Sequence, residues 1–121
     1  MHKVTQIKIL SDSSSSWMNS NQEFYFSRGW TKIGKTMVKT SLFEVQQLVT
    51  MAKEVEKDGD PVIDSSAATS KTLCDNSVSW MENNINWLLE KGWKLDGQVR
   101  MEMSLFDIHF IADLVKPKGA Q

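Results

Sequence analysis

Apolar and polar residues alternate in two short stretches of the chain, a pattern that indicates a strand with one buried face. Residues 3–10 place Thr5, Ile7 and Ile9 on one side. Residues 98–103 place Val99, Met101 and Met103 on one side and Gln98, Arg100 and Glu102 on the other. We therefore expect a strand in each stretch. Residues 65–73 are small and polar, and the most they predict is a poor strand at a sheet edge.

A helical pattern occupies residues 76–91, where apolar side chains recur at steps of three and four residues: Val78, Met81, Ile85 and Leu88. Asp75 is expected to cap the first turn, because its carboxylate can accept from free backbone N–H groups. Gly92 is expected to end the helix in a left-handed conformation.

One stretch of the chain is written twice. Gly29–Glu44 (GWTKIGKTMVKTSLFE) returns as Gly92–Asp107 (GWKLDGQVRMEMSLFD), an offset of 63 residues without a gap. In the same register, 15 of the 46 pairs between residues 8–53 and 71–116 are identical. We interpret this likeness as a tandem duplication.

The duplication predicts the elements of the first copy. A helix should follow Asp12 as its N-cap and include Phe24–Phe26, although these aromatic residues alone would favour a strand. The next strand should point Thr36, Val38 and Thr40 inward and Lys35, Met37 and Lys39 outward.

A second helix is predicted in each copy. Ser41 with Glu44, and Ser104 with Asp107, have the spacing of a capping box. The first of these helices would run through about residue 57 along a stripe formed by Val45, Leu48, Val49, Ala52 and Val55. The other would be shorter, with Ile108, Ile111, Ala112 and Val115 in line, until Pro117 ends it and leaves 116–121 as a frayed tail.

These elements predict an α+β fold in which a strand–helix–strand–helix unit occurs twice about an approximate two-fold axis. At 121 residues the chain fits one domain with one shared core, made of repeats 1–58 and 64–117 and a linker over 57–68. A layered α/β sheet with parallel strands is the alternative.

Composition narrows the class of protein. A net charge of −1 argues against strong non-specific binding to nucleic acid or to anionic membranes. The single cysteine, Cys74, excludes an intramolecular disulfide, and the chain shows no membrane span and no secretory signal. We therefore expect a cytoplasmic protein.

No catalytic constellation is visible. The histidines His2 and His109 lie far apart, the glycines form no phosphate-binding pattern, and Cys74 has no histidine near it in sequence. We expect no metal and no cofactor, and a binding or regulatory protein that acts through protein–protein contacts, including self-association, rather than an enzyme. The interaction surface predicted for it is the outward strand face: Lys35, Met37, Lys39, Gln98, Arg100 and Glu102.

Two alternatives stay open. Lys32, Lys35 and Lys39 follow Trp30 and could hold nucleic acid, with the indole stacking on a base. A small-molecule pocket, or the site of a modest enzyme, could instead lie between the copies. The residues that would line this pocket are paired across the duplication: Asn21 and Asn84, Trp17 and Trp80, Trp30 and Trp93.

Overall fold

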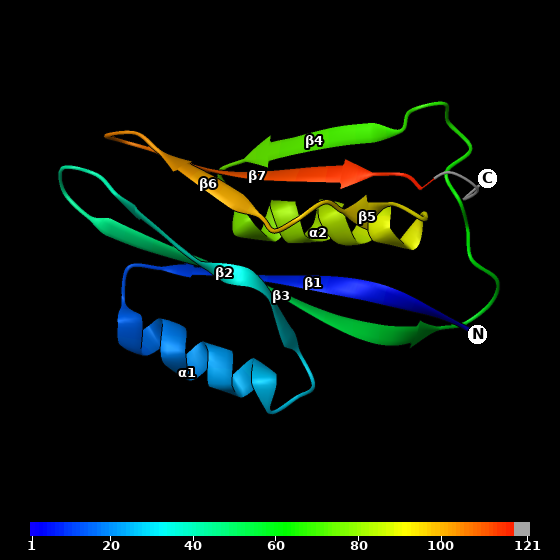
Figure 1. Ribbon diagram of the computed structural model, residues 1–121, viewed down its shortest axis with the longest axis horizontal. Coiled ribbons are helices and arrows are strands. Elements are labelled where there is room, and N and C mark those ends of the chain that lie inside the picture. The colour runs from blue at the N-terminus through cyan, green and yellow to red at the C-terminus, as the bar shows by residue number, and fades with distance from the viewer. Residues whose placement is uncertain (118–121) are drawn as a thin grey trace.

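The computed structural model describes residues 1–117 (Figure 1), so most of the tail expected over 116–121 lies outside the described residues. The elements, in chain order, are β1 (His2–Asp12), α1 (Ser15–Phe26), β2 (Thr31–Thr40), β3 (Val45–Lys57), β4 (Ser70–Asp75), α2 (Val78–Glu90), β5 (Lys94–Leu95), β6 (Arg100–Met103) and β7 (Ile108–Val115).

Two antiparallel sheets organise these elements. In the first sheet β3 lies between β1 and β2, and in the second β7 lies between β4 on one side and β5 and β6 on the other. The elements form four layers: α1, the first sheet, α2 and the second sheet (Figure 1). The protein contains both helices and strands but is richer in strand than predicted, and the alternative with parallel strands is wrong.

The second helix predicted in each half is wrong, because both segments are strands, β3 and β7. Strand accounts for 46% of the structure and helix for 21%. The first half has the order strand–helix–strand–strand, and the second half has one strand more, because β5 and β6 are separate. The centre of β3 resembles a helix in sequence because both of its faces are covered. Leu48, Val49, Thr50 and Met51 are all buried, and a run that is apolar on both faces has no period of two.

The expected two-fold arrangement is also wrong. A two-fold axis would bring like surfaces of the two halves together. Instead α2, from the second half, packs on the face of the first sheet opposite to α1 (Figure 1). The two halves therefore stack in the same orientation, in the order α1, first sheet, α2, second sheet.

Both helices begin close to where the sequence predicts, but their N-cap residues differ from the predicted ones. Ser14 and Ser77 are the N-caps, and their hydroxyl oxygens accept from the N–H groups of Trp17 and Trp80. The predicted caps, Asp12 and Asp75, lie two residues earlier and accept from the N–H groups of those serines. Phe24–Phe26 is helical, as is its counterpart in α2, and Gly92 has the expected left-handed φ of 94°.

The largest buried cluster combines both halves. Ile7, Ile9 and Leu48 of the first sheet pack with Met81, Ile85 and Leu88 of α2 and with Phe110, Ala112 and Leu114 of β7. A smaller cluster under α1 joins Leu10, Met18, Val49 and Met51. The interior of the molecule is therefore continuous from the first sheet to the second.

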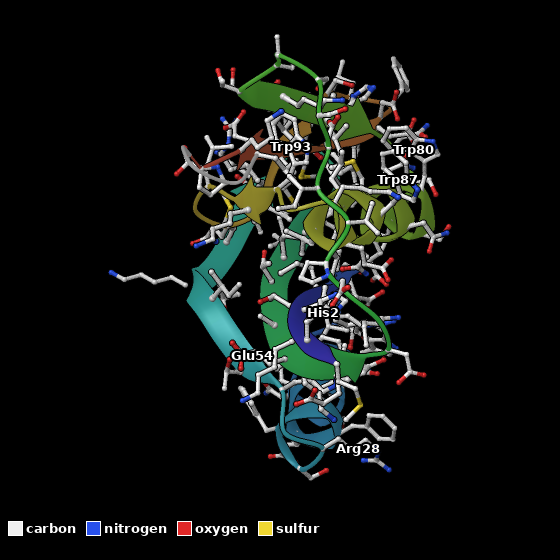
Figure 2. All side chains as sticks on the ribbon, turned by 90° about the vertical axis from the view of Figure 1, so that its right-hand side faces the viewer. His2, Arg28, Glu54, Trp80, Trp87 and Trp93 are labelled. Atoms are coloured by element: carbon white, nitrogen blue, oxygen red, sulfur yellow. The ribbon has the colours of Figure 1, made fainter. Side chains whose placement is uncertain are left out.

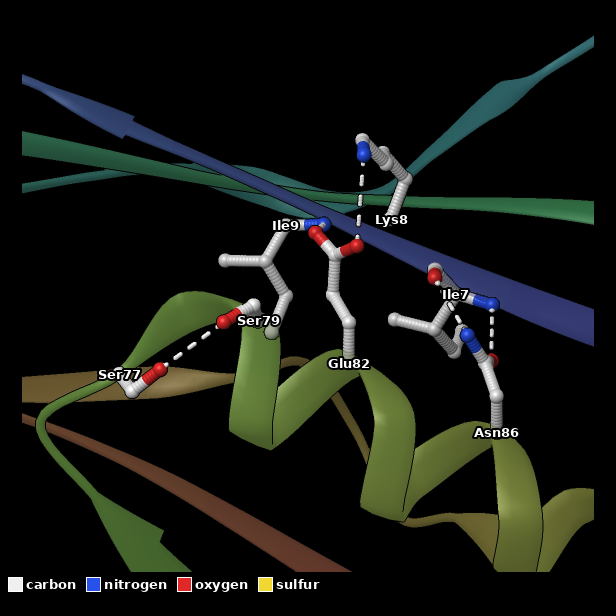
Figure 3. A network of polar contacts seen from close by, with 7 residues as sticks. All are labelled: Ile7, Lys8, Ile9, Ser77, Ser79, Glu82 and Asn86. Atoms are coloured by element: carbon white, nitrogen blue, oxygen red, sulfur yellow. Dashed lines mark hydrogen bonds and ion pairs between the residues drawn. The ribbon is translucent and has the colours of Figure 1, made fainter.

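Polar side chains of α2 cover the outer edge of β1 (Figure 3). The carboxamide of Asn86 accepts from the N–H of Ile7 at 2.7 Å and donates to the C=O of Ile7 at 3.1 Å. The carboxylate of Glu82 accepts from the N–H of Ile9 at 3.0 Å. These side chains take the place of a neighbouring strand, so the backbone groups of the edge are satisfied.

Glu82 also pairs with Lys8, whose Nζ lies 3.3 Å from its carboxylate (Figure 3). Burial by itself would lower the pKa of Lys8. The charge of Glu82, together with Tyr25, outweighs burial and raises that pKa above 10.5.

Three further hydrogen bonds join the halves. The buried hydroxyl of Thr50 accepts from the N–H of Val99 at 3.1 Å. The side chain of Gln98 pairs with both backbone groups of Lys35, at 3.1 and 2.8 Å. Gly34 permits this approach, since a Cβ there would lie 2.0 Å from the Gln98 oxygen.

Candidate functional site

The residues predicted to form an outward strand face do not share one face. Met37 packs against the core, while Val38, predicted to point inward, is 56% exposed. The β2–β3 register breaks between Ile33 and Met37, where β2 carries two extra residues. Ile33 and Met37 therefore stay on one face, the face that packs against the second half. Lys39 is exposed, and Lys35 is paired through its backbone with Gln98.

Arg100 and Glu102 do point outward as predicted, but from the second sheet. Arg100 forms an ion pair with Asp113 at 2.8 Å, on the outer face of that sheet. The six predicted residues are therefore distributed over two sheets, and no single contact surface contains them.

The predicted pocket residues do not converge either. Asn21 and Asn84 each donate to a carbonyl four residues earlier in their own helix, at Trp17 and Trp80. Both of these tryptophans are 41% exposed, whereas Trp30 packs in the core under α1 and Trp93 is only 2% exposed. Trp30 is thus unsuited to stacking on a base. A cavity of about 410 Å3 does lie between the halves, but of the six predicted residues only Trp93 borders it.

Trp93 anchors the linker between the halves. Its Nε1–H donates to the carboxylate of Asp64 at 3.1 Å. The N–H of Ser66 donates to the same carboxylate, and these two donors lower the pKa of Asp64 from 3.8 to about 2. Lys116 donates to the carbonyl groups of Asp64 and Ser66, so the end of β7 holds the linker in place.

The most unusual surface of the molecule lies at the turns that end the β2–β3 and β6–β7 hairpins. Both turns contain the sequence Ser-Leu-Phe, in Ser41–Phe43 and Ser104–Phe106. Leu42 and Phe43 are 81% and 79% exposed, and Leu105 and Phe106 are 52% and 94% exposed. We call Leu42, Phe43, Leu105 and Phe106 the tip cluster.

The two turns lie at the same end of the molecule (Figure 1). Residues of both line one open hollow of about 400 Å3, among them Phe43 and Phe106. The tip cluster therefore gathers exposed apolar side chains of both halves around one hollow. Large exposed apolar patches of this kind usually mark an interaction site.

The serine of each turn fixes its shape. The N–H of Ser41 donates to the C=O of Glu44 at 2.9 Å, and the N–H of Ser104 donates to the C=O of Asp107 at the same distance. The hydroxyl of Ser41 also accepts from the N–H groups of Phe43 and Glu44. These short turns leave no interior for the Leu and Phe side chains to fill, so both project into solvent.

This site is hard to find in the sequence, because a serine hydroxyl that accepts from N–H groups two and three residues later is also what starts a helix. Ser-Leu-Phe-Glu therefore fits a capping box equally well. The signal in the sequence is that the same tripeptide, Ser-Leu-Phe, occurs at residues 41–43 and 104–106, where the structure has exposed turns.

Acidic side chains surround the tip cluster. Glu44, Glu102 and Asp107 lie in or beside the turns, against the single cation Lys39. His109 lies 3.5 Å from Asp107. The field at this end is thus negative, which disfavours anionic membranes and favours a partner with a basic rim.

The described residues offer little for catalysis. Within residues 1–117, no group of three His, Cys, Asp or Glu side chains is placed to hold a metal ion. Cys74 is exposed on β4, while His109 lies on β7 beside Asp107. No helix in this part of the chain has the length and apolar character to cross a membrane.

Comparison with family models, with curated proteins and with solved structures finds no match for this chain.

Proposed function

We propose that this is a small binding protein that docks on a partner protein through the tip cluster. The observation that carries the proposal is the exposure of four large apolar side chains, presented by two turns of the same sequence at one end of the molecule. The partner has an apolar pocket for these side chains and basic groups around it that match Glu44, Glu102 and Asp107.

The energetics support a docking role. Burial of one leucine or phenylalanine side chain contributes roughly 1.5–3 kcal/mol. Each turn therefore offers a few kcal/mol of binding energy, and removal of one turn's pair should weaken binding at least about tenfold. Because short hairpin turns are already ordered, little conformational entropy is lost on binding.

The experiment places a photoreactive phenylalanine analogue at Phe43 or Phe106 in the cell of origin, with the analogue at the exposed Glu54 of β3 as the matched control. A protein that crosslinks from both tips and not from residue 54 is then purified and its affinity measured. The double variant Leu42→Ser/Phe43→Ser should weaken its binding at least about tenfold. An unchanged affinity, or the same crosslinks from all three positions, would refute the proposal.

A lipid surface is the competing occupant. Flotation with anionic and with neutral vesicles separates the two. The acidic rim disfavours anionic vesicles, and a protein partner as the occupant predicts no binding to neutral ones. Vesicle binding that depends on Phe43 and Phe106 would replace a protein partner with a membrane.

A further inference from the structure

The outer edge of β4 is the counterpart of the β1 edge. The β1–β3 register pairs Ile7 with Ala52, and the β4–β7 register pairs Ser70 with Val115, each residue 63 positions later. Since Ile7 and Ile9 direct their backbone groups away from β3, Ser70 and Thr72 direct theirs away from β7.

The two edges differ in what covers them. The carboxamide of Asn86 occupies the β1 edge in the way that a peptide group of a neighbouring strand would. Within residues 1–117, no backbone or side-chain group bonds the outward N–H and C=O groups of Ser70, Thr72 and Cys74. The group that fits this edge is therefore another peptide backbone.

Exposed tryptophans lie beside this edge. Leu89, on one flank of α2, borders a cavity together with Lys94 and Leu95 of β5. Trp80 and Trp87 are on the opposite flank, which is therefore the β4 side, and Figure 2 shows both on the outside of the molecule below β4. They are 41% and 57% exposed.

The charges of β4 are self-complementary. In an antiparallel pair of β4 strands centred on Leu73, Lys71 lies opposite Asp75 of the second copy, and Asp75 lies opposite its Lys71. The same register sets Thr72 opposite Cys74, both with outward backbone groups. The side chains of Ser70, Thr72 and Cys74 are small, so they leave room for the approach of a second strand.

We infer that two copies of this chain associate through their β4 edges, in an antiparallel pair centred on Leu73, and so form a two-fold symmetric dimer. The second sheets of the two copies become one continuous sheet. The α2 helices beneath it then face each other through Trp80 and Trp87, which become buried. The four residues of the tip cluster take no part in this pairing, although Asn76, directly after β4, borders the hollow between the hairpin turns.

The test is a disulfide that only this register permits. In the variant Thr72→Cys, the new thiol lies opposite Cys74 of the second copy, at the separation that a disulfide requires. The matched control is Ser70→Cys, where the same register places Asn76 opposite the new thiol. Under mild oxidation Thr72→Cys should give a covalent dimer in which the introduced thiol of each copy is bonded to Cys74 of the other, as peptide mapping will identify. Ser70→Cys and the unmodified chain should stay largely monomeric on a denaturing gel.

A second variant separates association from folding. Thr72→Pro removes an N–H that points away from β7, so it leaves the β4–β7 ladder intact and blocks the added strand. Sedimentation of the unmodified chain should show a dimer that dissociates on dilution, and Thr72→Pro should be monomeric with its far-UV circular dichroism unchanged. A monomeric unmodified chain at several hundred micromolar, or equal crosslinking of Thr72→Cys and Ser70→Cys, would overturn the inference.

Discussion

At the scale of single residues, Asn84 and Asn86 show how position decides what an amide contributes. They are two residues apart in α2. Asn84 bonds a carbonyl of its own helix and faces solvent, whereas Asn86 bonds both backbone groups of Ile7 across the join between the halves. Only the second amide replaces a missing strand.

Asn86→Ala should therefore lower the free energy of unfolding by about 1–3 kcal/mol, because it leaves the N–H and C=O of Ile7 without partners. Asn84→Ala is the matched control and should change it by less than about 0.5 kcal/mol. Urea denaturation followed by tryptophan fluorescence measures both values. Equal losses in the two variants would mean that the bond to Ile7 contributes nothing specific.

Asp64 should show a pH dependence of its own. Its pKa is lowered from 3.8 to about 2, so the stability that it contributes is fully present above pH 3.8 and is lost as the pH falls through about 2. The carbon-13 resonance of its carboxyl group should titrate with a midpoint near 2. A midpoint near 3.8 would show that the bonds from Ser66 and Trp93 are absent in solution.

At the scale of elements, the sequence predicts several of the strands and helices that bury only one face. Alternation indicated β1 and the strand that contains Met101, and the stripe from Met81 to Leu88 indicated α2. The internal likeness then placed α1 correctly over Phe24–Phe26, against local propensity. The interpretation of the likeness as a duplication remains a prediction.

The strand β3 could not be assigned in this way, whereas β7 was missed although its buried residues Phe110, Ala112 and Leu114 alternate along the chain. Val45, Leu48, Val49, Ala52 and Val55 fit a helical stripe because β3 is covered on both faces, and its polar residue Thr50 is buried between the sheets. The candidate site is not apparent from the sequence either, since a turn that precedes a helix is not expected to expose its apolar residues. Only the pairing of distant segments resolves both points.

Thr50 gives an element-scale prediction. Its hydroxyl accepts from the buried N–H of Val99, which ties β3 to the second half. Thr50→Val keeps the volume but leaves that N–H unpaired, so it should reduce the free energy of unfolding by about 1–3 kcal/mol. Thr50→Ser, which keeps the oxygen and loses a methyl group, should cost about 1 kcal/mol. If Thr50→Val is the more stable of the two by chemical denaturation, the hydrogen bond is not what selects threonine.

At the scale of the whole molecule, the core joins two halves that each lack part of it. Without α2, the first sheet would expose Ile7, Ile9 and Leu48. Without the first sheet, α2 would expose the flank that holds Glu82 and Asn86. We therefore expect the halves to unfold as one cooperative unit.

Fragments 1–63 and 64–121 should therefore not unfold cooperatively when each is studied alone. Mixed in equal amounts, they should regain the near-UV circular dichroism of the intact chain, because the buried surfaces of α2 and β1 are complementary. Calorimetry of each fragment is the decisive measurement. A sharp transition in either fragment, at the temperature of the intact protein, would show that the shared core is dispensable.

Because the two halves stack in the same orientation, the second sheet has an outer face that no other element of residues 1–117 covers. Where the first sheet offers Ile7, Ile9 and Thr50 to α2, the second offers Ser70, Thr72 and Asp113 to solvent. These polar residues prevent a further helix from packing on the second sheet, so the stack of layers ends there. A triple variant would make that face resemble the inner one: Ser70→Ile, Thr72→Ile and Asp113→Thr. A third helix–sheet module could then be appended, which would lengthen the protein into a designed solenoid.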